Sequence, residues 1–136
     1  MSPEVLLKQH HLKVTPTRLV LLGCLERNPE PRGVPELFAD VKERGINYVS
    51  VYRTMNTFEK AGLVRRVNLR HGHTDYELVT EKDHHHHFVC SSCGMIEEFT
   101  GCDLDSLVKQ ALKSSKQFTT VDDHAIEFFG TCKKCV

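Results

Sequence analysis

Apolar side chains recur at helical spacing over the first 45 residues and predict three helices. The first covers Pro3 to His11. The second begins at Thr15-Pro16, a capping hydroxyl followed by a proline at the first helical position, and runs to about Arg27. The third begins near Pro35 and ends at Gly45. The proline-rich segment 28–33 is predicted to be a loop.

A fourth helix is predicted between Asn47, a good N-cap, and Gly62, a good C-terminal stop. Its apolar residues Val51, Met55 and Phe58 follow the i, i+4, i+7 spacing, so they should face a core. A different face carries short polar side chains and a single charge. Its members are Ser50, Arg53, Thr54 and Thr57. We expect this face to be exposed.

Strand-like segments dominate the rest of the chain. Leu63-Val64 and Tyr76 to Val79 flank a glycine-containing turn at 71–73 and predict a two-stranded wing. From about Glu81 the order is a histidine-rich strand, a CxxC turn, a strand over 95–99, a helix over 104–112, a long strand over 118–129 and a second CxxC. The predicted fold class is α+β, with a winged-helix domain over 1–80 and a small α/β domain over 81–136.

Composition restricts the setting of the protein. No apolar run is long enough to cross a bilayer, and the N-terminus lacks the basic-then-apolar pattern of a secretory signal. The expected location is therefore the cytoplasm, where disulfides are rare. Residues 1–80 carry 12 Lys and Arg against 9 Asp and Glu, and residues 81–136 carry 6 against 9. The net charge of zero argues against a nonspecific nucleic-acid coat but is compatible with a DNA-binding protein that has one basic face.

Two CxxC pairs provide the clearest chemical signal. Four thiolates form a closed tetrahedral site, which is typical of a structural zinc ion. The ligands would be Cys90, Cys93, Cys132 and Cys135. The alternatives are two unrelated cysteine pairs or a redox dithiol. Cys24 and Cys102 fall outside this pattern: we interpret Cys24 as a buried helix residue and assign no role to Cys102.

Four consecutive histidines precede the first CxxC. Side chains alternate along a strand, so His84 and His86 should point one way and His85 and His87 the other. One strand can then serve two metal sites: Asp105 and His124 suit the first, and Glu77 and Glu98 suit the second. Imidazole favours zinc, iron, copper or nickel over magnesium and calcium. The alternative is a solvated strand with ordinary surface histidines.

Together these motifs resemble the ferric uptake regulator (Fur) superfamily over about residues 5–135. The resemblance rests on LKVTPTR from Leu12, SVYRTMNTFEKAGLV from Ser50, HHHHFVCSSCG from His84, and His124 followed by the terminal CxxC. It implies a homodimer, joined through the second domain, that places the fourth helix of each subunit in the major groove of a pseudo-palindromic operator.

The resemblance also implies DNA contacts. Tyr52 would pack on thymine methyl groups, and Arg53 would reach a phosphate or a purine edge. Lys13 would reach the minor groove and Arg18 the backbone. Arg53, with Ser50 and Thr57 beside it, is also expected from the helix face described above. The alternative role for Tyr52 is core packing.

The family's metal sites map onto both histidine sets. One consists of His84, His86, Asp105 and His124, and the family's hinge site consists of Glu77, His85, His87 and Glu98. His86 stands where the iron-type pattern has aspartate, which resembles the zinc-responsive branch. The hinge site normally includes a histidine just before the third helix, but Pro31-Arg32-Gly33 occupies that stretch. His71, His73 or Asp75 could replace it, or the site is incomplete.

We therefore expect a metal-responsive transcriptional repressor that controls metal homeostasis, with a structural Zn²⁺ and a regulatory Zn²⁺, Fe²⁺ or Mn²⁺ as corepressor. Its partners would be an operator in double-stranded DNA and a second copy of the chain, with no membrane. One alternative is a peroxide-responsive regulator of the same family. The others are a zinc-binding interaction module and a zinc hydrolase using Glu98 or Glu127 as base, although no HExxH or nucleophile motif is present.

Overall fold

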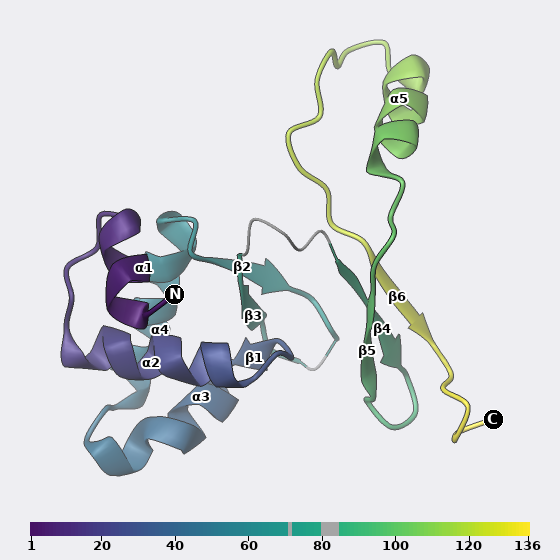
Figure 1. Ribbon diagram of the computed structural model, residues 1–136. Helices are drawn as coiled ribbons and strands as arrows, with labels where there is room; N and C mark the ends of the chain where they lie inside the picture. Colours follow the sequence, from purple (N-terminus) through teal and green to yellow (C-terminus); the bar gives the residue numbers. More distant parts are fainter. Residues whose placement is uncertain (71, 80–84) are drawn as a thin grey trace. The chain divides into compact units, whose positions relative to one another are not determined.

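A computed structural model describes residues 1–70, 72–79 and 85–136 (Figure 1). The chain forms two compact units, Met1–Thr80 and Glu81–Val136. Both units combine helix and sheet, so the α+β fold class is confirmed. No helix among the described residues is long and apolar enough to cross a membrane.

The N-terminal unit begins with the predicted helices. They are α1 (Pro3–Gln9), α2 (Pro16–Arg27), α3 (Val34–Val41), the 3₁₀ turn η1 (Lys42–Arg44) and α4 (Tyr48–Lys60). The Thr15 hydroxyl accepts a hydrogen bond from the N–H of Arg18, and Asn47 Oδ1 accepts one from the N–H of Ser50, so both predicted caps are formed. Gly45 and Gly62 end their segments with positive φ values of 78° and 77°.

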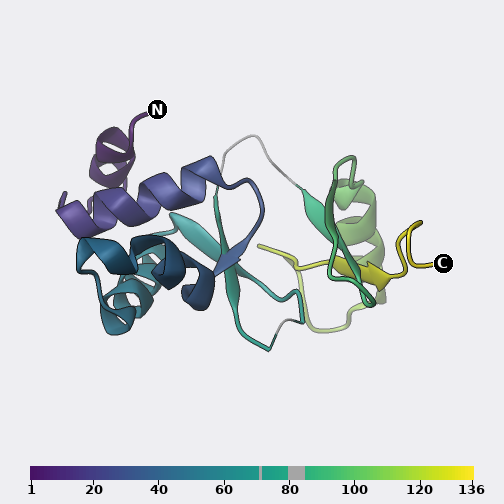
Figure 2. The ribbon, with the colours of Figure 1, turned by 90° about the horizontal axis from the view of Figure 1, so that it is seen from below.

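The longer helices of this unit pack together around one apolar core. Figure 2 shows α2, α3 and α4 stacked, with the small sheet at one end of the stack. Val51, Met55 and Phe58 are fully buried, as their spacing predicts. Thr54 is a correction: it is buried, and its hydroxyl donates to the carbonyl of Ser50, because its position lies at the edge of the core face.

The sheet of this unit has three strands in the order β1-β3-β2. The hairpin of β2 (Val64–Val67) and β3 (Asp75–Leu78) is the predicted wing. The prediction that all of 28–33 is loop was wrong at its end, because β1 (Arg32–Gly33) pairs antiparallel with β3 and adds a third strand to the sheet. A two-residue strand has no periodicity to read, so only its pairing with β3 reveals it.

The C-terminal unit contains a second three-stranded sheet, ordered β5-β4-β6. Its elements are β4 (His86–Cys90), β5 (Ile96–Phe99), α5 (Leu104–Ser114) and β6 (Glu127–Gly130). β4 pairs antiparallel with β5 and parallel with β6. The predicted strand over 118–129 was too long, because regular pairing begins only at Glu127.

Candidate metal centres and the exposed face of helix α4

The sheet of the C-terminal unit brings the two CxxC turns together. Parallel pairing of β4 with β6 aligns Cys90 with Gly130, so the chain leaves both strands at the same edge. The first turn closes when the N–H of Gly94 donates to the carbonyl of Cys90, and the second when the N–H of Cys135 donates to that of Cys132. The cysteines thus face one another across two short turns.

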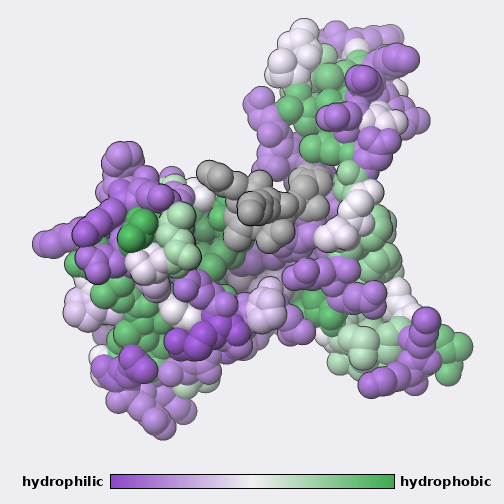
Figure 3. All heavy atoms as spheres, in the orientation of Figure 1, coloured by the Kyte–Doolittle hydropathy of each residue, from purple (hydrophilic) through white to green (hydrophobic). Residues whose placement is uncertain are grey.

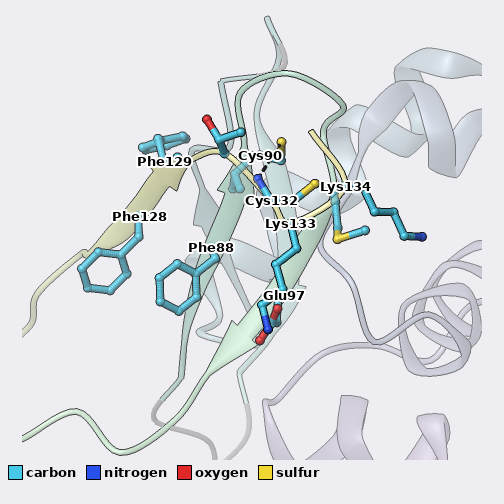
Figure 4. A pocket seen from close by; sticks show the side chains of 12 residues that line it. Phe88, Cys90, Glu97, Phe128, Phe129, Cys132, Lys133 and Lys134 are labelled. Carbon is cyan, nitrogen blue, oxygen red and sulfur yellow. Dashed lines mark hydrogen bonds between the residues drawn. The ribbon is translucent and has the colours of Figure 1, made fainter. Parts of the chain in front are cut away.

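All four sulfurs lie within 4.8 Å of one another. The Sγ atoms of Cys93 and Cys132 are 3.7 Å apart. The N–H of Cys132 donates to Cys90 Sγ at 3.3 Å (Figure 4). None of the cysteines is in a disulfide. This arrangement fits the predicted structural zinc site.

Hydrogen bonds within the quartet separate the pKa values of its thiols. The N–H of Cys132, together with those of Cys93 and Ser92, lowers the pKa of Cys90 to about 6. Hydrogen bonds with the neighbouring cysteines, Cys132 first and then Cys93, raise the pKa of Cys135 to about 12. The protein alone therefore does not hold four thiolates at neutral pH, whereas a divalent cation between the sulfurs would stabilise all four.

A second cluster joins β4 to the segment before β6. The Nε2 atoms of His86 and His124 lie 3.2 Å apart, and their rings meet edge to face at 5.0 Å. Cys102 Sγ completes a group whose ligand atoms lie within 4.8 Å of one another. Two imidazoles and a thiol that converge in this way are a suitable ligand set for a soft or borderline divalent metal.

This cluster differs from the predicted ligand set. His86 and His124 come together as expected, but Asp105 is exposed in the first turn of α5 and is not in the group. His84 lies outside the described residues. The third member of the group is instead Cys102, to which the sequence analysis assigned no role. Its position between β5 and α5, just before the helix that carries Asp105, is a signal that could have drawn attention to it.

The opposite face of β4 carries His87, with His85 close by. His87 is 1% exposed, and its ring meets that of His85 edge to face at 5.0 Å. Glu127 Oε2 accepts from the N–H of His87 at 2.9 Å and lies 3.0 Å from His87 Nδ1. A carboxylate on Nδ1 fixes the tautomer in which Nε2 carries the lone pair, as in many metal-binding histidines. The sequence did not indicate this pairing, which depends on the parallel register of β4 and β6.

The remaining members of the predicted second set lie on two different sheets. Glu98 is exposed on β5, directly opposite His87 in the β4–β5 register. Glu77 is on β3 in the N-terminal unit, where Arg65 donates to its carboxylate at 2.6 Å. The Glu77 side chain is buried.

Helix α4 exposes the face expected to contact a partner. Arg53 is exposed, and Ser50 and Thr57 are half-buried beside it. Tyr52 is 49% exposed, so the alternative that it packs in the core was wrong. Exposed Tyr48 and Val49, which the sequence reasoning missed, extend this face into the first turn. An aromatic and basic surface on a helix is suited to base edges and phosphates.

Lys13 and Arg18 lie at the start of α2. Lys13 is exposed, and the Arg18 guanidinium donates to the carbonyl of Lys13 at 2.8 Å. Arg18 therefore orders the turn that presents Lys13. This hydrogen bond uses one part of the guanidinium group, and its other N–H groups can donate to an anion.

Comparison with known proteins relates both units to one family. Residues 9–129 match the model of the ferric uptake regulator family. The chain is 34% identical over 140 residues to the ferric uptake regulation protein of Legionella pneumophila, covering 99% of each chain.

Solved structures give the same result. The ferric uptake regulator from Francisella tularensis with iron has 31% identity and a TM-score of 0.75, covering 91% of this chain and 94% of that one. A zinc-bound manganese uptake regulator has 30% identity and a TM-score of 0.72, covering 97% and 99%. Similarity to structures that hold different metals does not by itself select a metal for this chain.

Proposed function

The chain belongs to the ferric uptake regulator family, and from this premise we propose that it is a metal-dependent transcriptional repressor acting in the cytoplasm. In this proposal it binds pseudo-palindromic operators in double-stranded DNA as a homodimer, with a divalent metal ion as corepressor. It controls genes of metal homeostasis.

The exposed face of α4 carries the DNA-binding part of the proposal. Core packing fixes one side of the helix through Val51, Met55 and Phe58, and leaves Tyr52 and Arg53 on the other. A helix packed in this way can enter a major groove as a rigid element. Arg53 then reaches a guanine edge or a phosphate, and Tyr52 packs on thymine methyl groups. Lys13 reaches the adjacent minor groove, and Arg18 contacts the DNA backbone.

The cysteine quartet is proposed to hold a structural zinc ion. The sheet of this unit has few buried apolar side chains, with Val89 and Cys90 among them. A domain with so small a core is near the size at which a metal is needed for stability. The ion is therefore expected to remain bound throughout regulation.

The regulatory ion is proposed to bind His86, His124 and Cys102, with His84 as a further candidate ligand. A thiolate and two imidazoles favour zinc over manganese, which prefers oxygen ligands. A second regulatory site is proposed from Glu77, His85, His87 and Glu98, with Glu127 orienting His87. We therefore favour regulation by zinc over regulation by iron or by peroxide.

The homodimer is supported by the unpartnered surface of the C-terminal unit. Helix α5 is amphipathic, yet none of its residues is buried. Leu107 on α5 is 43% exposed and Phe118 after it is 73% exposed. Apolar side chains are visible at the surface around α5 in Figure 3. A second copy that covers them removes this apolar area from water.

The regulatory step is a population shift. When bound, the ion supplies a fixed positive charge that holds its ligands in one arrangement, and this arrangement is proposed to have the higher affinity for DNA. An ion shifts the equilibrium only by its differential affinity for the two states. A coupling of about 1–3 kcal/mol would tighten operator binding roughly 5–150-fold.

The decisive experiment measures metal content and DNA binding on the same untagged samples. Random-sequence duplexes are selected on protein with added Zn²⁺, and the selected duplex is then titrated with zinc-replete and mildly chelated protein. We expect one retained zinc per chain, one or more removable ions, a selected sequence with two-fold symmetry, and weaker binding after chelation. Equal affinity of the two samples would contradict the metal-gated mechanism.

Arg53→Ala separates the DNA-binding proposal from that of a zinc-binding interaction module. We expect it to weaken binding to the selected duplex, while Arg27→Ala, an exposed arginine at the end of α2, leaves it unchanged. An interaction module would show no sequence selection and no difference between the two variants. Hydrogen peroxide added to the metal-loaded protein on the selected duplex tests the peroxide-responsive alternative. That alternative requires low concentrations of peroxide to release the protein from the DNA.

A further inference from the structure

A third group of metal-binding side chains lies entirely within the N-terminal unit. His73 Nε2 is 3.2 Å from Glu36 Oε1 and 3.3 Å from Asp75 Oδ1. One ligand atom from each residue lies within 4.8 Å of the other two. Glu36 is on α3, Asp75 begins β3, and His73 comes from the segment just before β3. Helix α3 and the segment that leads into β3 therefore converge on one point.

Gly33 makes room for this convergence. It is the antiparallel partner of Asp75 in the β1–β3 register. A Cβ atom at position 33 would lie 2.3 Å from His73 Cδ2 and 2.7 Å from Glu36 Oε2. The imidazole therefore packs directly over bare backbone, and any side chain at this position would displace it. Because Gly33 has a φ of −87°, which every residue can adopt, the glycine is needed here for space and not for its conformation.

The charge of the group also favours a cation. Asp75 is 1% exposed, and Glu36 Oε2 is buried without a hydrogen-bond partner. The Glu36 side chain as a whole is 42% exposed, but a buried carboxylate beside a second, partly buried one is costly unless positive charge is supplied. With a neutral imidazole the group has two negative charges, which a divalent ion would neutralise.

We propose that Glu36, His73 and Asp75 bind a divalent first-row transition-metal ion. One imidazole nitrogen and two carboxylate oxygens suit Zn²⁺, Mn²⁺ or Fe²⁺. The bound ion ties α3 to β3 and so fixes the base of the wing hairpin against the helices. This site goes beyond the proposed function, because all its ligands lie in residues 1–80 and it requires neither the cysteine quartet nor the histidine-rich strand.

The test uses the full chain with the cysteine quartet intact and the histidine-rich strand removed as a competitor by His86→Ala and His87→Ala. Zinc content is measured after equilibrium dialysis against buffered Zn²⁺, and again with Mn²⁺ replacing it. We expect the quartet zinc plus one removable ion per chain. Adding His73→Gln should weaken binding of the removable ion by at least about tenfold, because even residues that only support a ligand are worth about 10–100-fold.

Two further variants make the test specific. His11→Gln makes the same change at an exposed histidine of the same unit and should leave binding unaltered. Gly33→Ala leaves every ligand in place but crowds the His73 ring, so it should also weaken binding. Circular dichroism shows whether each variant keeps its helices, and a variant that unfolds is replaced by Glu36→Gln, whose side chain is half-buried at the start of α3.

A protonated His73 that simply pairs with the two carboxylates is the competing explanation. In that case the background chain binds the quartet zinc only, and the proposal is overturned. It is equally overturned if His73→Gln and His11→Gln bind the removable ion alike. Neither result affects metal-gated DNA binding by the unaltered chain, so failure of this site is distinguishable from failure of the proposed function.

Discussion

At the scale of single residues, Cys102 changes the chemistry expected of the regulatory site. The sequence pattern indicated a ligand set of imidazoles and a carboxylate. The structure instead brings a thiol to His86 and His124. Thiolates bind zinc in preference to manganese, whereas a carboxylate would reduce that preference. If Cys102 is a ligand as proposed, one side chain between β5 and α5 shifts the metal preference of the site towards zinc.

We predict that Cys102→Ser lowers the affinity for Zn²⁺ much more than the affinity for Mn²⁺. The hydroxyl is a harder and weaker ligand than the thiolate, so the zinc-to-manganese preference should fall by at least about tenfold, or about 1.4 kcal/mol. Competition dialysis with both ions measures it. Cys24→Ala, which removes a buried thiol from α2, is the control. An unchanged ratio in Cys102→Ser would show that Cys102 is not a ligand.

At this scale, a contact could be predicted from the sequence when its residues lie close together along the chain. The cysteine quartet was predictable because each CxxC spacing is local and its chemistry is specific. The pairing of His87 with Glu127 was not, because it joins residues 40 apart through a parallel strand register. The position of His73 over Gly33 likewise depends on a two-residue strand that leaves no pattern.

At the scale of elements, local signals predicted the helices well and the strands less well. Caps and stops for α2 and α4 stood where the sequence placed them, because a cap is a short-range hydrogen bond. The strand before the second CxxC was predicted too long, since the residues before Glu127 lack a pairing partner within the described chain. Strand length depends on the neighbouring strand, which a single segment does not encode.

We predict that Asn47→Ala destabilises the N-terminal unit by about 1 kcal/mol, because α4 loses the side chain that accepts from the N–H of Ser50. Urea unfolding followed by circular dichroism measures the change. Asn56→Ala, in the middle of the same helix, is the matched control and should be neutral or slightly stabilising, since alanine is the better helix former. Equal effects of the two changes would mean that Asn47 does not act as a cap.

At the scale of the whole molecule, the two units depend on different sources of stability. The N-terminal unit has an apolar core of helix residues, including Leu21, Leu37 and Phe58. The C-terminal unit relies on its sheet and on the proposed zinc. Loss of metal should therefore affect the two units unequally.

We predict that Cys135→Ser, or removal of the quartet zinc by a strong chelator, unfolds the sheet of residues 81–136 and leaves α2 to α4 folded. Binding of a structural ion is coupled to folding, so removing one of its four ligands weakens both together. Amide hydrogen exchange should show lost protection in β4 and β6 and retained protection in Leu21, Leu22 and Met55. Uniform loss of protection through both units would contradict this division.

Self-association is expected to depend on the apolar surface around α5. We predict that Phe118→Asp gives a monomer in sedimentation or scattering measurements, because a charge would be buried at the contact between copies. Phe88→Asp, at another exposed aromatic of the same unit, tests whether the effect is specific to this surface. A dimer that survives Phe118→Asp but not Phe88→Asp would place the contact on the sheet face.

The parallel pairing of β4 with β6 also bears on the synthesis of the protein. All contacts within the first unit are available once residue 80 has left the ribosome, but the first CxxC must wait for the second, which follows 39 to 42 residues later. At about 5–20 residues per second, this interval lasts roughly 2–8 seconds. During it, Cys90 and Cys93 belong to a nascent chain with no closed site. The unit proposed to bind DNA is thus able to fold before the unit proposed to hold the regulatory metal, and the newly made thiols have a brief period in which an oxidant or the wrong metal can reach them first.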